Sequence, residues 1–262
     1  MTDVHIDRRT ELARIAGLLA ADESGVGVVC GEPRIGKTAL LAEAFQRHRP
    51  DRPAVLIDLE ETAEPGQVLE RIVTRLRGRV TFPSYERLRA RIPPVRSALR
   101  TGDVTLSGSA RMTFVVDGVR QRAAQARQLT PVFVEDLARA GQHRPLLLFD
   151  HFDRCPSAEV RGWLREDLLP GATLHADVLV LVASAGEPWG SGPPAAWLPG
   201  VVPYLFRLGP FTLDDVRDWL AALGIDRSDA LADYLWRRMR GVPGPIRDEL
   251  VPYLLARRDD GR

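Results

Sequence analysis

The segment GEPRIGKT at residues 31–38 constrains this chain more than any other feature of its sequence. It matches the pattern G-x-x-x-x-G-K-[ST], in which a glycine-rich turn joins a buried strand to a helix. Residues 26–30 before it are apolar and too few for a helix, and residues 38–48 after it have a helical pattern. The glycines let backbone N–H groups point inward at phosphate oxygens, and the positive end of the new helix adds to the attraction. The segment therefore predicts a phosphate-binding loop.

Two side chains of this loop have specific expected roles. Lys37 reaches the β- and γ-phosphates as a compact charge, and the Thr38 hydroxyl ligates Mg²⁺. Lys37 is the single lysine among the 36 lysines and arginines of the chain. The wide fork of arginine cannot replace an ammonium group in so tight a loop, which explains why a lysine stands there. The predicted nucleotide-binding residues of the loop are Gly31, Glu32, Pro33, Arg34, Ile35, Gly36, Lys37, Thr38 and Ala39.

A second apolar run, at residues 145–149, leads into two acids, Asp150 and Asp153. In proteins with such a loop, an acid at this strand end holds Mg²⁺, so Asp150 is predicted to share the metal with Thr38. Asp153 could orient or deprotonate the attacking water. The candidate catalytic residues are therefore Lys37, Asp150 and Asp153.

Two alternatives remain open next to Asp150. Asp153 could instead cap a helix that begins near Pro156. His151 stands where many such ATPases carry glutamate, and it could simply pack or face solvent. Nucleotide binding follows from the loop, whereas hydrolysis depends on the role of Asp153.

Strand and helix signals alternate along most of the chain. We expect strands at 26–30, 54–59, 145–149, 178–183 and 204–208, and helices at 5–22, 38–48, 65–76, 131–140 and 156–169. Residues 78–130 are less regular, and the Gly- and Pro-rich residues 186–200 have the composition of a loop. This alternation predicts an α/β fold, a P-loop NTPase three-layer sandwich with a mostly parallel sheet.

After Pro210 the strand signals stop. Helical patterns at 212–223, 229–240 and 245–257 predict a small all-α lobe. We therefore expect two domains, a nucleotide-binding domain at 1–209 and a helical lid at 210–262.

Composition excludes several classes of protein. The formal net charge of +1 gives no global attraction to nucleic acid or to an anionic membrane. No apolar run reaches 18 residues and the N-terminus lacks the apolar core of a signal peptide, so we expect no membrane span and a cytoplasmic location. The two cysteines have neither metal-ligand spacing nor the number that a disulfide scaffold needs.

The order of these motifs resembles the STAND class of signalling NTPases, within the AAA+ group. Residues 6–12, which include Arg8, resemble the motif at the start of that class, which lies near the adenine. GEPRIGKT resembles its Walker A loop, and LLLFDHFD at 146–153 resembles its Walker B strand. Ser184 takes the place of the polar sensor, and Pro243 belongs to the Gly-x-Pro turn that closes over the base. Arg8, Ser184 and Pro243 are therefore further predicted nucleotide contacts.

The chain departs from this class at Glu187, where an arginine often follows the sensor strand. The resemblance implies an ADP-bound resting state and an ATP-bound signalling state, with slow hydrolysis and Mg²⁺ as cofactor. It also implies a separate effector or signalling protein as partner, and allows a nucleotide-dependent oligomer. ATP is expected rather than GTP, because no guanine-reading Asn-Lys-x-Asp segment is present.

Other features leave alternatives open. The arginines of residues 71–100 could form a nucleic-acid surface, as in a DNA-associated AAA+ loader or transposition-type regulator, or a solvated face. Trp189 and Trp197 could form a partner-facing patch or pack their loop. Of Arg237, Arg238, Arg240 and Arg247, we favour Arg247 as a phosphate contact, because it opens the helix after the Gly-x-Pro turn. A small-molecule phosphotransferase lacks support, since no lid with clustered arginines is evident.

Overall fold

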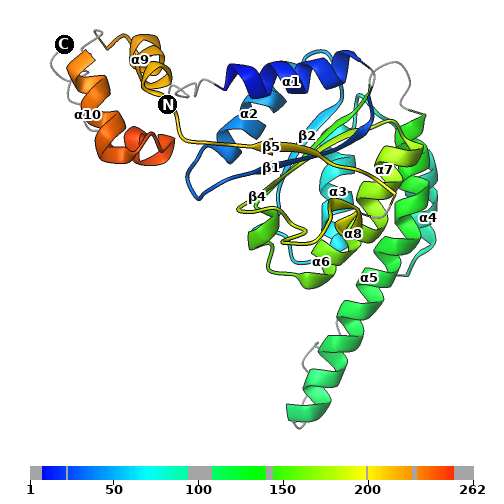
Figure 1. Ribbon diagram of the computed structural model, residues 1–262. Helices are drawn as coiled ribbons and strands as arrows, with labels where there is room; N and C mark the ends of the chain where they lie inside the picture. Colours follow the sequence, from blue (N-terminus) through cyan, green and yellow to red (C-terminus); the bar gives the residue numbers. More distant parts are fainter. Residues whose placement is uncertain are drawn as a thin grey trace, which may run out of the picture.

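The computed structural model describes residues 8–21, 23–93, 108–139, 144–198, 200–225 and 229–250. Five strands form one sheet in the order β2-β3-β4-β1-β5, and every neighbouring pair is parallel (Figure 1). The strands are β1 Gly25–Cys30, β2 Ala54–Asp58, β3 Leu146–Asp150, β4 Leu179–Ser184 and β5 Tyr204–Arg207. The predicted parallel sheet is confirmed, and each strand lies within one or two residues of its expected bounds.

Helices cover both faces of this sheet (Figure 1). Strands β1, β3 and β4 are buried along their whole length, which is typical of parallel strands covered on both sides. One face packs on α1 and α2, and the other on α3, α5, α6 and α7. The helices before β5 are α1 Arg9–Ala20, α2 Lys37–His48, α3 Pro65–Leu76, α4 Pro83–Arg91, α5 Gly108–Ala138, α6 Ala158–Trp163, α7 Leu169–His175 and α8 Pro194–Trp197. The expected three-layer α/β sandwich is thus the observed fold.

The predicted start of the helix at 131–140 is wrong. This helix is the end of the 31-residue α5, which contains Pro131 and whose N-terminal part extends away from the body of the protein (Figure 1). The apolar pattern continues across the proline, because Leu129 and Phe133 are both buried in the same core. The Thr130 hydroxyl donates a hydrogen bond to the Ala126 carbonyl at 2.8 Å. Tertiary burial therefore outweighs the local cost of the proline.

The helix expected at 156–169 also runs further than predicted. A π-helical turn, η2 (Leu164–Leu168), joins α6 to α7, and the helical path ends at His175. This turn shifts the hydrogen-bond register, so that Pro170 lies in the first turn of α7, where a proline is tolerated.

The loop expected at 186–200 contains one helical turn, α8. Trp197 is 5% exposed, and its ring lies 5.8 Å from that of Trp189 and 6.0 Å from that of Phe152. The two tryptophans therefore pack this loop against the body and do not form an exposed patch.

The C-terminal helices have a hydrophobic core of their own. Helix α9 (Leu213–Ala222) begins with a capping box between Thr212 and Asp215, and α10 (Asp229–Met239) packs against it. A third helix begins at residue 243, two residues earlier than expected, and reaches 250, the last described residue. The core residues of this lobe are Phe211, Val216, Trp219, Leu220, Ile225, Ala232, Leu235, Ile246 and Leu250. The domain boundary between 209 and 210 stays a prediction.

In the described part of the chain, none of the helices is both long enough and apolar enough to cross a lipid bilayer.

Candidate functional site

A cleft of about 530 Å³ lies where β1, β3 and β4 end and α2 begins. In an open parallel sheet, this carboxyl edge is where ligands bind. The cleft collects residues from four separate parts of the sequence, including the C-terminal lobe. Its lining residues are Pro33, Arg34, Gly36, Lys37, Thr38, Ala39, Asp150, His151, Asp153, Arg154, Ala183, Ala185, Pro243, Gly244 and Arg247.

The loop before α2 has the curled backbone that its two glycines predict. Gly36, the N-cap of α2, has φ 103°, and Gly31 has φ 154°. A Cβ atom on Gly31 would lie 2.7 Å from the Leu208 carbonyl oxygen, so a side chain there would displace backbone. The loop is therefore built around glycine at both positions.

The Lys37 ammonium group folds back over the loop. Its Nζ donates hydrogen bonds to the carbonyl oxygens of Gly31 at 2.7 Å and of Glu32 at 2.9 Å. Burial lowers the pKa of Lys37 below its ordinary value, and the negative charges of Asp153 and Asp150 oppose that shift. Lys37 therefore lies among the acids of the cleft, poised for a group with more negative charge than a carbonyl oxygen.

Asp150 ends β3 and is only 4% exposed. Its Oδ1 accepts a hydrogen bond from the His151 backbone N–H at 2.9 Å, and its side chain lines the cleft together with Thr38. A carboxylate and a hydroxyl are the hard oxygen donors that Mg²⁺ prefers. The residues present thus fit a magnesium site, and the two ligand assignments stay predictions.

Asp153 lies in the short 3₁₀ turn η1 (Phe152–Arg154) after β3. Its Oδ1 accepts a hydrogen bond from the Ala185 N–H at 2.9 Å, which ties the end of β3 to the end of β4. The alternative that Asp153 caps the next helix is wrong, because Ser157 is the N-cap of α6 and accepts from the Val160 N–H. Asp153 therefore lines the cleft with no capping role.

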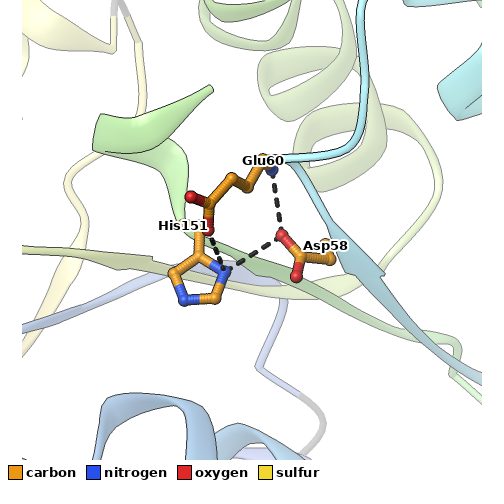
Figure 2. Close-up of side chains that lie close together, drawn as sticks. All are labelled: Asp58, Glu60 and His151. Carbon is orange, nitrogen blue, oxygen red and sulfur yellow. Dashed lines mark hydrogen bonds and ion pairs between the residues drawn. The ribbon is translucent and has the colours of Figure 1, made fainter. Parts of the chain in front are cut away.

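Sequence reasoning missed two acids beside the cleft, Asp58 and Glu60. Strand β2 pairs with β3 so that Asp58 lies opposite Asp150. Figure 2 shows the carboxylates of Asp58 and Glu60 both near Nδ1 of the His151 ring. Nδ1 lies 3.0 Å from Asp58 Oδ1 and 3.8 Å from Glu60 Oε2. The signal in the sequence is an acid at the end of an apolar strand, but only the strand order shows which strand it adjoins.

These acids change the protonation of His151. Burial lowers its pKa, but the hydrogen bond with Asp58 and the charges of Asp150, Asp58 and Glu60 outweigh burial, so the pKa of His151 is raised. Burial raises the pKa of Asp58, but hydrogen bonds from His151 and the Glu60 N–H outweigh it, so that pKa is lowered. His151 is therefore neither a purely packing residue nor a purely solvated one.

Arg8 lies outside the lining residues of the cleft. Its guanidinium group donates to the carbonyl oxygens of Ile35 and Gly209, both at 2.8 Å, and lies 4.7 Å from the centre of the Phe211 ring. Burial lowers its pKa against the opposing charges of Glu11 and Asp215. Arg8 thus links the phosphate loop to the segment that leads into the lobe, outside the cleft. Its predicted nucleotide contact stays a prediction.

The other predicted residues divide between the cleft and the core. Ile35 and Ser184 are buried, at 1% and 4% exposure, and the neighbours of Ser184, Ala183 and Ala185, line the cleft. Gly31 and Glu32 contribute through the carbonyl groups that hold Lys37.

The C-terminal lobe contacts the phosphate loop directly. The Gly244 N–H donates to the Arg34 carbonyl oxygen at 3.0 Å, and the Arg34 side chain pairs with Asp248. Of the four arginines considered in the lobe, Arg247 is the one among the lining residues of the cleft. The lobe therefore completes one wall of the site.

Comparisons with known proteins agree with this geometry. A family model described as an AAA domain matches residues 20–170. The Walker-type ATPase of Pyrococcus abyssi is 14% identical, with a TM-score of 0.55, covering 92% of this chain and 65% of its own. The STAND protein with a tetratricopeptide repeat sensor from Pyrococcus horikoshii is 16% identical, with a TM-score of 0.51. The match covers 92% of this chain and 29% of that protein.

A third similar structure is Drosophila ORC bound to DNA, which is 17% identical, with a TM-score of 0.52, covering 95% of this chain and 55% of its own. The chain therefore spans less than two thirds of each of these three proteins. At such identities the likeness shows the fold alone. No curated protein matches the sequence.

Proposed function

The chain belongs to the AAA domain family, and we propose that it is an ATP-dependent regulatory switch of the STAND type. In this proposal it binds ATP or ADP with Mg²⁺, hydrolyses ATP slowly, and signals to a separate effector protein in the cytoplasm. The observation that carries it is the shared cleft, in which Lys37, Thr38 and Asp150 meet Pro243 and Arg247 of the lobe.

This arrangement couples nucleotide to lobe in a simple physical way. A nucleotide held by the loop would contact lobe residues on the opposite wall. Because ATP has a γ-phosphate and ADP does not, ATP and ADP would favour different lobe positions. The Arg8 hydrogen bonds to Ile35 and Gly209 join the loop to the connection that carries the lobe. When bound, Mg²⁺ neutralises phosphate charge, while Thr38 and Asp150 would hold it and Lys37 would orient the phosphates.

The test is calorimetric titration of ADP and ATP with Mg²⁺, followed by turnover in the same samples. We expect both nucleotides to bind and turnover to lie below about one per second, the lower limit of ordinary enzymes. Binding of neither nucleotide would overturn the proposal. Fast turnover would instead point to a working motor or loader.

Asp153→Asn is expected to lower ATP turnover about a hundredfold and leave ATP affinity within about threefold. Asparagine keeps the oxygen that accepts from Ala185 but cannot take a proton from water. Asp233→Asn, in the lobe and paired with Arg237, is the matched control. Equal turnover in Asp153→Asn and wild type would remove Asp153 from the reaction.

The alternative is a DNA-associated AAA+ ATPase. It is supported by the fold likeness to ORC and by the arginines of α3 and α4. However, Arg77 pairs with Glu86 at 3.2 Å and Arg89 pairs with Glu70, while Arg96 and Arg100 lie outside the described residues. Internal partners of this kind lower the charge available to phosphates, which favours the solvated-face interpretation.

Fluorescence anisotropy of a labelled DNA duplex at about 50 mM salt separates the two functions, because phosphate contacts are strongest at low salt. We expect no salt-sensitive binding. DNA-stimulated turnover would make the alternative the better proposal.

A further inference from the structure

Arg154 is a cation of the cleft that no sequence motif singled out. It ends the turn η1, directly after Asp153, and lines the cleft with Lys37 and Thr38. Its side chain is 57% exposed, and its guanidinium group lies 3.8 Å from Glu60 Oε2, near the outer limit of an ion pair. An exposed pair at that distance contributes little to stability. The arginine can therefore change partners easily.

Three arginines line the cleft, and the other two are engaged with the lobe. Arg34 pairs with Asp248, and Arg247 lies 3.5 Å from the same carboxylate. Arg154 instead has its ion pair with Glu60, outside the lobe, and lines the cleft together with Lys37. Burial is the main cause of the lowered Lys37 pKa, and the positive charge of Arg154 acts in the same direction. Arg154 and Lys37 line the same cleft, so one ligand in it could contact both.

Glu60 is a weak partner of Arg154 and also contacts His151. Its Oε2 lies 3.8 Å from His151 Nδ1 (Figure 2). The same oxygen lies 3.8 Å from Arg154, so one carboxylate has two long contacts to basic groups. Glu187 stands just beyond the sensor strand, where the resemblance implies an arginine, and it pairs with Arg207, outside the lining residues. Position 187 therefore offers no cation to a terminal phosphate, whereas Arg154 lines the cleft.

We propose that Arg154 contacts the terminal phosphate of a bound nucleoside triphosphate, leaving Glu60 to do so, and thereby distinguishes ATP from ADP. The guanidinium fork matches phosphate oxygens with two parallel hydrogen bonds, which a long contact to one carboxylate oxygen does not provide. ADP has no γ-phosphate to offer this contact. The inference rests on the proposed function and names the residue by which the switch reads its nucleotide.

The experiment is calorimetric titration of a non-hydrolysable ATP analogue and of ADP, each with Mg²⁺, into wild type, Arg154→Ala and Arg165→Ala. Arg165 is a partly exposed arginine on η2 that pairs with Glu166 away from the cleft, so it controls for the loss of one positive charge. We expect Arg154→Ala to weaken analogue binding roughly tenfold and ADP binding less than about twofold. Arg165→Ala should bind both like wild type.

A third variant tests the exchange of partners. In Glu60→Gln the arginine loses its competing carboxylate, so analogue affinity should rise by about twofold while ADP affinity stays the same. A fall in analogue affinity there would contradict the exchange.

The outcomes separate this inference from the proposed function. Wild-type protein that binds neither nucleotide would overturn the proposed function itself. Wild-type binding together with an equal loss of both ligands in Arg154→Ala, or with no loss of either, would overturn the assignment of Arg154 alone.

Discussion

Lys37→Ala is expected to weaken binding of ATP with Mg²⁺ by about a hundredfold or more, because it removes the one point charge inside the phosphate loop. The ammonium group is now held by the carbonyl oxygens of Gly31 and Glu32, which are poor partners compared with a phosphate. Turnover should fall with binding. Calorimetry measures the affinity, and thermal unfolding checks that the loop variant still folds.

Lys37→Arg is the sharper companion variant, because it keeps the charge and changes only its shape. The planar fork is too wide for the space between two carbonyl groups 2.7 and 2.9 Å from Nζ, so we expect affinity to fall nearly as far as in Lys37→Ala. This result would explain why the only lysine of an arginine-rich chain stands here. Unchanged affinity in Lys37→Ala would mean that the loop does not bind phosphate.

Trp163→Ala is expected to lower the free energy of unfolding by about 3–5 kcal/mol, the largest stability effect we predict for a single side chain. Trp163 ends α6, is 1% exposed, and its Nε1 donates to the Thr130 hydroxyl at 2.8 Å. Alanine would leave a cavity between α6 and α5 and deprive Thr130 of its donor. Urea unfolding monitored by circular dichroism gives the free energy.

Trp163→Phe separates the lost volume from the lost hydrogen bond, and Tyr234→Ala is an exposed control. Trp163→Phe keeps most of the volume, so it should cost less than the alanine variant, chiefly through the lost hydrogen bond. Tyr234→Ala removes a ring that is 48% exposed on α10, and should change the free energy by no more than about 1 kcal/mol. Equal effects of Trp163→Ala and Tyr234→Ala would show that the packing around α6 is not what stabilises the fold.

The sequence by itself determined the local features of this protein. The phosphate loop is one contiguous segment, and its glycines, lysine and threonine act through backbone geometry that neighbouring residues impose on one another. The buried strands could be predicted from short apolar runs. Helix α3 begins and ends where its proline and its apolar spacing predict. Asp150 was predictable for the same reason, because it directly follows such a run.

Only the tertiary structure decided which residues from distant segments lie next to one another. Asp58 and Glu60 adjoin His151 because β2 is the neighbour of β3, and strand order depends on packing between distant segments. The same applies to Pro131, which stays inside α5 because the buried face on either side of it holds the helix together. Nothing in the sequence indicated that Arg8 donates hydrogen bonds to two backbone carbonyl groups 27 and 201 residues away. Such contacts form only once the sheet, the loop and the lobe are assembled, since a buried guanidinium group takes whichever hydrogen-bond acceptors the completed fold brings within reach.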